Sequence, residues 1–188
     1  MHTALLRSYE SKRPNEVDCT IWEAGRATSA ASSFFDPIKI GHLDETFVDG
    51  ATGCNNPIEK VFEEALDIWG ESARERISCF VSIGTGQPTE RGFGKGLKEI
   101  ASTLIHISTE TEQTAVRFSR VHAPFIGSSS TSRNTYFRFN VAKGLEEIGL
   151  ERHEDKAKIA AATKVYLSNP QTSDDLIACA GVLKSQCT

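Results

Sequence analysis

The residues whose types and spacing could support catalysis lie in one short stretch, residues 47–57 (FVDGATGCNNP). The apolar run Thr46–Val48 predicts a strand that delivers Asp49 to its end. Gly50 is expected to take backbone angles that a side chain would forbid, and a helix is expected to begin at Asn56 or Pro57. A carboxylate between the end of a strand and the start of a helix lies where open α/β sheets place their sites, and it can act as a general base.

Two simpler interpretations of the same stretch remain open. An Asp-Gly pair such as Asp49-Gly50 is a common signal for the turn of a β-hairpin. The pair Asn55-Asn56 is typical of residues that cap the start of a helix rather than of residues that bind a ligand.

Other residues that could take part in binding or catalysis form no complete motif. The glycines of Gly84–Gly86 and Gly92–Gly96 follow an apolar run, as in a phosphate-binding loop, but they match neither G-x-x-x-x-G-K-[ST] nor G-x-G-x-x-G. The five histidines are scattered and include no H-x-x-x-H pair, so we expect no metal site. The five cysteines lie far apart with no C-x-x-C pair, which favours reduced and mostly buried thiols.

The elements that must position these residues alternate between strand and helix. Strands are expected at Thr3–Tyr9, Pro37–Ile40, Thr46–Val48, Ile77–Ile83 and Thr135–Val141. Helices are expected at Glu23–Ala31, from Asn56 or Pro57 to Trp69, at Leu97–Ile107 with a broken continuation through Val116 and Phe118, at Asp155–Leu167 and at Ser173–Lys184. The continuous apolar run Ile77–Ile83 is typical of a strand covered on both faces, and Phe34, Phe35, Phe137 and Phe139 are expected in the core. The alternation predicts an α/β fold with helices packed on a sheet.

Composition restricts the class of protein. The 188 residues include 21 basic and 25 acidic side chains, a net charge of −4, which argues against a nucleic-acid-binding protein. A hydrophobic content of 39% excludes a disordered chain. The sequence contains no apolar run of about 18 residues that could span a membrane, and its first residues lack the apolar core of a signal peptide. We therefore expect a cytoplasmic protein.

Four ordered landmarks resemble the patatin-like phospholipases. Residues Ile21–Phe35 match the family stretch W-x-A-x-R-A-T-S-A-A-x-x-F-F, and Asp49–Ala51 matches the family's Asp-Gly-Gly/Ala motif. Asn55–Pro57 and Val81–Gly86 follow as the next two landmarks. The similarity extends less sharply to Tyr136–Asn140 and the closing helices, as in multidomain members, so further domains in a longer protein are compatible with it.

This resemblance implies a three-layer α/β/α hydrolase that cleaves acyl lipids or membrane-surface phospholipids with a Ser-Asp dyad. In that family the serine lies in a G-x-S-x-G elbow, a Gly-rich segment forms the oxyanion hole, and the aspartate accepts the serine proton without a histidine. Carried over to this chain, Asp49 is the proton acceptor, with Gly50 and Ala51 as the rest of its motif. The dyad implies no cofactor and no metal.

The sequence departs from the family pattern at the nucleophile. It contains no G-x-S-x-G and no Gly-Gly-Gly run, and the nearest string, Gly127–Thr131, has a threonine at the final glycine and lies after Asp49 rather than before it. A Ser-rich loop is the expected structure there. We therefore expect residues 1–188 to be the C-terminal portion of a single patatin-like domain, inactive alone because the serine is missing. The alternative is a non-catalytic regulatory or interaction module.

Overall fold

The computed structural model describes residues 3–11, 17–31, 34–87, 98–126, 135–146, 148–149 and 152–185. The chain divides into two compact units, Met1–Asn55 and Asn56–Thr188. Each unit is described by itself, and the expectation of a single domain stays a prediction. None of the helices in the described ranges has the length and apolar character needed to cross a membrane.

The first unit contains a short helix and a β-hairpin. Its elements are α1 (Ile21–Ala27), β1 (Ile38–Ile40), β2 (Glu45–Phe47) and α2 (Ala51–Cys54). Strands β1 and β2 pair antiparallel with Ile38 opposite Phe47, which confirms the two expected strands and the turn between them. Helix α1 begins with a capping box, because Thr20 Oγ1 accepts the N–H of Glu23 and the Glu23 carboxylate accepts the N–H of Thr20.

Two expectations for the first unit are wrong. Residues 3–9 form no strand, since β1 and β2 pair only with each other within the described residues. The first helix ends at Ala27 rather than Ala31. It stops there because Thr28 Oγ1 donates to the carbonyls of Ala24 and Gly25, and Ser29 Oγ also donates to Gly25.

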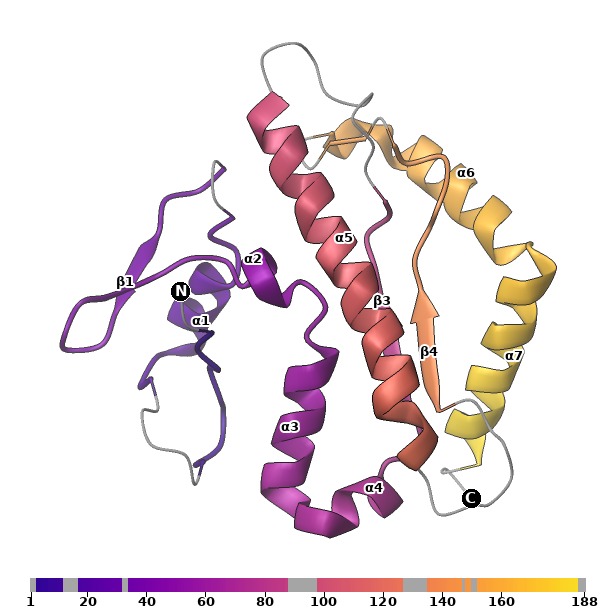
Figure 1. Ribbon diagram of the computed structural model, residues 1–188. Helices are drawn as coiled ribbons and strands as arrows, with labels where there is room; N and C mark the ends of the chain where they lie inside the picture. The colour runs from indigo at the N-terminus through magenta and orange to yellow at the C-terminus, as the bar shows by residue number, and fades with distance from the viewer. Residues whose placement is uncertain are drawn as a thin grey trace. The chain divides into compact units, whose positions relative to one another are not determined.

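The second unit is a parallel strand pair between two layers of helices (Figure 1). Its elements are α3 (Ile58–Trp69), η1 (Gly70–Ser72), α4 (Ala73–Arg76), β3 (Phe80–Ile83), α5 (Lys98–Val121), η3 (Ala123–Phe125), β4 (Tyr136–Phe139), η4 (His153–Asp155), α6 (Lys156–Leu167) and α7 (Pro170–Lys184). Strands β3 and β4 pair with Phe80 opposite Tyr136 and Ile83 opposite Phe139. Helices α3 and α5 lie on one side of the pair, and α7, which contacts β4, lies on the other with α6 (Figure 1). The expected α/β class is confirmed.

The core of the second unit is an aromatic cluster between α3, α5 and the strands. Phe118 has no exposed surface and packs edge to face against Phe62 at 5.9 Å, Phe80 at 5.2 Å and Tyr136 at 5.1 Å between ring centroids. Such pairs prefer this geometry because the positive edge of one ring meets the negative face of the next. The cluster fixes which face of β3 and β4 is turned toward α5.

The expected helix after Asn56-Pro57 is confirmed with its start one residue later. Pro57 is the N-cap, and Asn56 Oδ1 accepts the N–H of Ile58 at 3.4 Å. The helix ends where Gly70 adopts φ +61°, a conformation that glycine reaches without strain. The chain enters the second unit at this capped helix.

Four expectations for strands, helices and core differ from the structure. The expected break in the third long helix is absent, and α5 is continuous over 24 residues. It continues because Ala115 and Phe118 keep one face of its C-terminal half buried. Strand β3 is shorter than expected, and its side chains alternate between buried and exposed, with Ile83 78% exposed. Helix α7 begins at Pro170, three residues before the expected start, because Asn169 caps it. Phe137 is buried as expected, whereas Phe35 is 61% exposed.

Candidate functional site

The Asp49 turn connects β2 to α2 in the first unit. Asp49 follows the end of β2 by two residues and is half-buried. Its N–H donates to the carbonyl of Ala30 at 3.0 Å, which ties the turn to the segment after α1. Its Oδ1 accepts the N–H of Ala51 at 2.8 Å. This side-chain bond to the backbone two residues ahead holds the carboxylate in one orientation at the start of a helix.

The hairpin interpretation of Asp49-Gly50 is wrong, because the pair leads from a strand into a helix. The hairpin turn lies at Gly41–Asp44 instead, with Asp44 at φ +52°. The expectation of a special backbone at Gly50 is also wrong. Gly50 has φ −67° and ψ −4°, which any residue adopts, and a Cβ there meets no atom within 4 Å.

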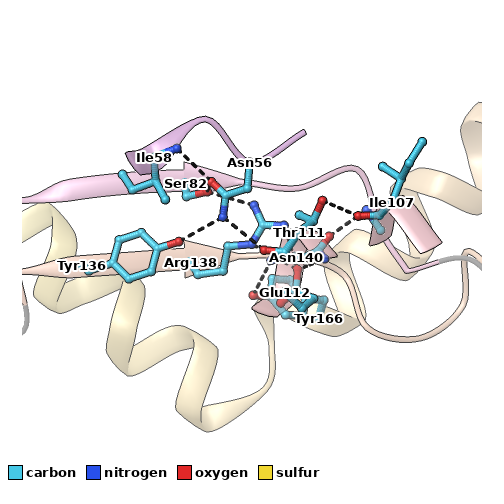
Figure 2. Close-up of polar contacts among 11 residues, drawn as sticks. Asn56, Ile58, Ser82, Ile107, Thr111, Glu112, Tyr136, Arg138, Asn140 and Tyr166 are labelled. Atoms are coloured by element: carbon cyan, nitrogen blue, oxygen red, sulfur yellow. Dashed lines mark hydrogen bonds and ion pairs between the residues drawn. The ribbon is translucent and has the colours of Figure 1, made fainter. Parts of the chain in front are cut away.

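Asn56 is a capping residue, as expected, and is also the centre of a buried polar network (Figure 2). Its Nδ2 donates to the carbonyl of Thr111 and to Tyr136 Oη, each at 3.4 Å, and its Oδ1 also accepts from Ser82 Oγ at 3.1 Å. These contacts use the two donors and both lone pairs of the amide. Asn56 is 6% exposed and has no bonding capacity left for a ligand.

Arg138 extends the network toward the carboxyl ends of β3 and β4. Its Nη1 donates to Ser82 Oγ at 2.9 Å, and its Nη2 donates to Glu112 Oε1 at 2.8 Å (Figure 2). Asn140 Nδ2 donates to the same Glu112 oxygen at 2.8 Å, and Asn140 Oδ1 accepts the N–H of Gly86 at 2.8 Å. The network therefore joins the start of α3, both strands, α5 and the loop after β3.

The glycines of the loop after β3 are required by this packing. A Cβ at Gly84 would lie 2.3 Å from Asn140 Oδ1 and 2.7 Å from Arg138 Nη2. Gly86 has φ +102°, and a Cβ there would lie 2.8 Å from Leu145 Cδ1. Close side-chain approach explains Gly84–Gly86 without a bound phosphate. Gly92–Gly96 and Gly127–Thr131 lie outside the described residues.

The described residues contain no group of three His, Cys, Asp or Glu side chains that could hold a metal ion. His106 Nδ1 lies 3.7 Å from Glu110 Oε2 on α5, and the His122 ring packs against Phe62 and Phe118. Arg26 Nη2 donates to the carbonyl of Asp36 at 2.7 Å.

No motif in the sequence identifies the residues of this network as a set. A weak signal is present, because Arg138 and Asn140 alternate with Phe137 and Phe139 and so share a strand face with Tyr136. Period-two alternation predicts that shared face but not the partners Ser82 and Glu112, which come from other elements.

The α/β class of the second unit is consistent with part of a patatin-like fold. No family model matches the chain, and no solved structure matches it. Three curated relatives are similar to the chain. Calcium-independent phospholipase A2-gamma of Mus musculus is 31% identical over 72% of this chain and 16% of the relative. Phospholipase A I of Arabidopsis thaliana is 32% identical over 80% of this chain and 11% of the relative, and Patatin-like phospholipase 1 of Plasmodium falciparum isolate NF54 is 28% identical over 78% of this chain and 24% of the relative. The resemblance to patatin-like phospholipases is confirmed. The chain spans between 11% and 24% of the length of these relatives.

Proposed function

We propose that this chain is the aspartate-bearing part of a lipid acyl hydrolase, with Asp49 as the proton acceptor of a Ser-Asp dyad. The observation that carries the proposal is the Asp49 turn, in which one carboxylate oxygen is held by the N–H of Ala51 between a strand and a helix. The names of the relatives, all phospholipases, support a phospholipid or related acyl ester as the substrate.

In the proposed chemistry the two carboxylate oxygens of Asp49 have different roles. Oδ1 accepts the N–H of Ala51 and so fixes the turn, and Oδ2 accepts the proton of a serine hydroxyl as the serine attacks the ester carbonyl. Asp49 then returns the proton to the leaving alcohol and later activates the water that releases the fatty acid. In this proposal Gly50 and Ala51 keep the turn short, and neither a cofactor nor a metal takes part.

The serine of the proposed dyad comes from residues outside this sequence, because none of its 188 residues lies in a G-x-S-x-G elbow. Purified alone, the chain is therefore expected to hydrolyse neither short acyl esters nor phospholipid vesicles. The proposed setting is a lipid surface facing the cytoplasm.

A chimera tests the role of Asp49. The region that precedes the matched stretch of the Mus musculus relative is joined to Met1, and hydrolysis of a phospholipid with a fluorescent acyl chain is measured. Asp49→Asn keeps an oxygen for the N–H of Ala51 but removes the base, so activity should fall by roughly 10²-fold or more. Asp44→Asn is the matched control, since asparagine tolerates the positive φ of Asp44, and it should leave activity unchanged. An active chimera in which Asp49→Asn has no effect contradicts the proposal.

The missing nucleophile favours a second candidate, a non-catalytic patatin-like module. Such a module would bind a lipid or protein partner with no dependence on a carboxylate at position 49. A chimera that binds phospholipid vesicles, remains inactive, and binds equally well with Asp49→Asn would support this alternative over the hydrolase.

A further inference from the structure

Strand β3 has an open edge and a row of exposed side chains. Within the described residues it pairs only with β4, in a sheet of two strands. Its side chains alternate between buried and exposed, and the exposed ones are Val81 at 40% and Ile83 at 78%, here called the outward pair. Parallel strands are ordinarily covered on both faces, so exposed β-branched side chains on such a strand mark a surface that another element covers.

The hydrogen bonds of the strand pair show where the main-chain groups of β3 point. Phe80 N donates to the carbonyl of Thr135 at 2.7 Å, and Gly84 N donates to the carbonyl of Phe139 at 2.8 Å. In a parallel pair, alternate residues of a strand direct both their N–H and their C=O toward the partner strand. The outward pair therefore directs these groups to the opposite edge, where no strand lies among the described residues. Such an edge is a template for a further strand.

Strand β4, in contrast, is covered. Phe137 is the register partner of Val81 and is only 2% exposed, and α7 contacts β4. At the outer edge of β4, Asn140 N donates to Tyr166 Oη of α6 at 3.1 Å. Helices α6 and α7 lie on the β4 side of the pair (Figure 1). The open side of the sheet is therefore the side of β3.

We propose that this edge of β3 is the docking site of a strand and helix supplied from outside these 188 residues. The strand pairs parallel with β3 through the main-chain groups of the outward pair. The helix that is connected to it packs on the side chains of Val81 and Ile83. Parallel strands are joined by such crossover helices, and these are the elements that cover the faces of a parallel sheet.

Two observations favour this partner over a second copy of the chain. The curated relatives have the additional chain to supply it, since the matched part is between 11% and 24% of their length. A second copy offers its own β3, and the helix that follows, α5, is already packed through Phe118 on its own aromatic cluster. It therefore brings no free helix to cover the outward pair. The inference rests on the proposed function only in that both require residues outside this sequence.

Co-expression tests the association. The region that precedes the matched stretch of the Mus musculus relative is produced with an affinity tag beside the untagged chain, and the retained chain is quantified. Ile83→Lys should reduce retention by about tenfold or more, because it places a charge under the docked helix. Val165→Lys is the matched control, since Val165 is a β-branched residue that is 75% exposed on α6, and it should leave retention unchanged. Neither variant should change the thermal midpoint of the chain alone appreciably.

Amide hydrogen exchange, measured by NMR for single residues, locates the contact. In the chain alone, the amides of the outward pair should exchange much faster than the amide of Gly84, which is bonded to Phe139. In the complex, and in the chimera that joins the same region to Met1, they should be protected as strongly as Gly84. Both tests measure binding and not hydrolysis, so this inference can fail while Asp49 remains the dyad base, and the reverse.

Three results overturn the proposal. One is a chain that the tagged region does not retain, together with a chimera in which the amides of the outward pair stay unprotected. Another is an equal loss of retention with Ile83→Lys and Val165→Lys. The third is strong protection of the outward pair in the chain alone, which would show that the edge is already occupied, by a second copy if the protection rises with protein concentration.

Discussion

Arg117 on α5 binds Glu59 on α3 through both carboxylate oxygens: Nε lies 2.7 Å from Oε1, and Nη2 lies 2.8 Å from Oε2. The pair joins the two helices that enclose the aromatic cluster. The hydrogen bonds from Arg117 lower the pKa of the Glu59 carboxyl. The pKa of Glu59 is therefore lower in the folded state than in the unfolded state. The bond stabilises the folded state fully at pH values above the unfolded-state pKa, and this stabilisation is lost as the pH falls through the folded-state pKa.

Glu59→Gln is expected to lower the free energy of unfolding slightly at pH 7, because the pair is partly exposed and screened by solvent. The difference from wild type should shrink as the pH falls below the usual glutamate range, and also in about 1 M salt. Urea unfolding at a series of pH and salt values measures it. Glu63→Gln, in the exposed pair with Lys60, is the matched control on the same helix, and its effect should be smaller. A pH-independent difference for Glu59→Gln would contradict the linkage.

Phe118→Ala is expected to destabilise the second unit by about 3–5 kcal/mol, because it leaves a cavity among Phe62, Phe80 and Tyr136. Phe125→Ala removes the same atoms from a side chain that is 67% exposed, so its effect should be within about 0.5 kcal/mol. Thermal and urea unfolding measure both. Equal effects of the two substitutions would show that the cluster is not the core.

Asn56→Ala is expected to cost about 1–3 kcal/mol, because the buried hydroxyls of Ser82 and Tyr136 lose a partner. The exposed neighbour Asn55→Ala should cost clearly less. Urea unfolding measures the free energies. A double-mutant cycle with Ser82→Ala checks the mechanism, since the two changes should add to less than the sum of the single effects. Strict additivity would rule out the Asn56–Ser82 bond.

Gly84→Ala is expected to destabilise the protein by roughly 1–3 kcal/mol, because its Cβ would overlap the Asn140 side chain. That side chain is held in place, since its Oδ1 accepts the N–H of Gly86 and its Nδ2 donates to Glu112. Gly25→Ala is the matched control: it lies inside α1 with open space around its Cβ, and alanine favours helix there. Adding Asn140→Ala to Gly84→Ala should recover part of the loss. Failure of that rescue, with unfolding measured in urea, would place the cause of the destabilisation elsewhere.

Local signals predicted most of the elements. The hairpin strands at Ile38–Ile40 and Glu45–Phe47, the helix that ends at Gly70, and α6 and α7 all lie close to their expected ranges. Such elements depend on caps, turns and apolar periodicity within a few residues of each other. Residues 3–9 show the limit of these signals, because apolar residues form a strand only when another strand lies beside them.

The sequence by itself determined the charge balance, the order of the landmarks and the absence of an elbow serine from these 188 residues. Only the tertiary structure decided which distant polar groups meet. Asn56 bonds to Tyr136 across 80 positions, and Arg138 bonds to Ser82 across 56. The physical reason is that periodicity assigns a side chain to a face of its own element. The partner on that face depends on how α3, α5 and α7 pack around β3 and β4.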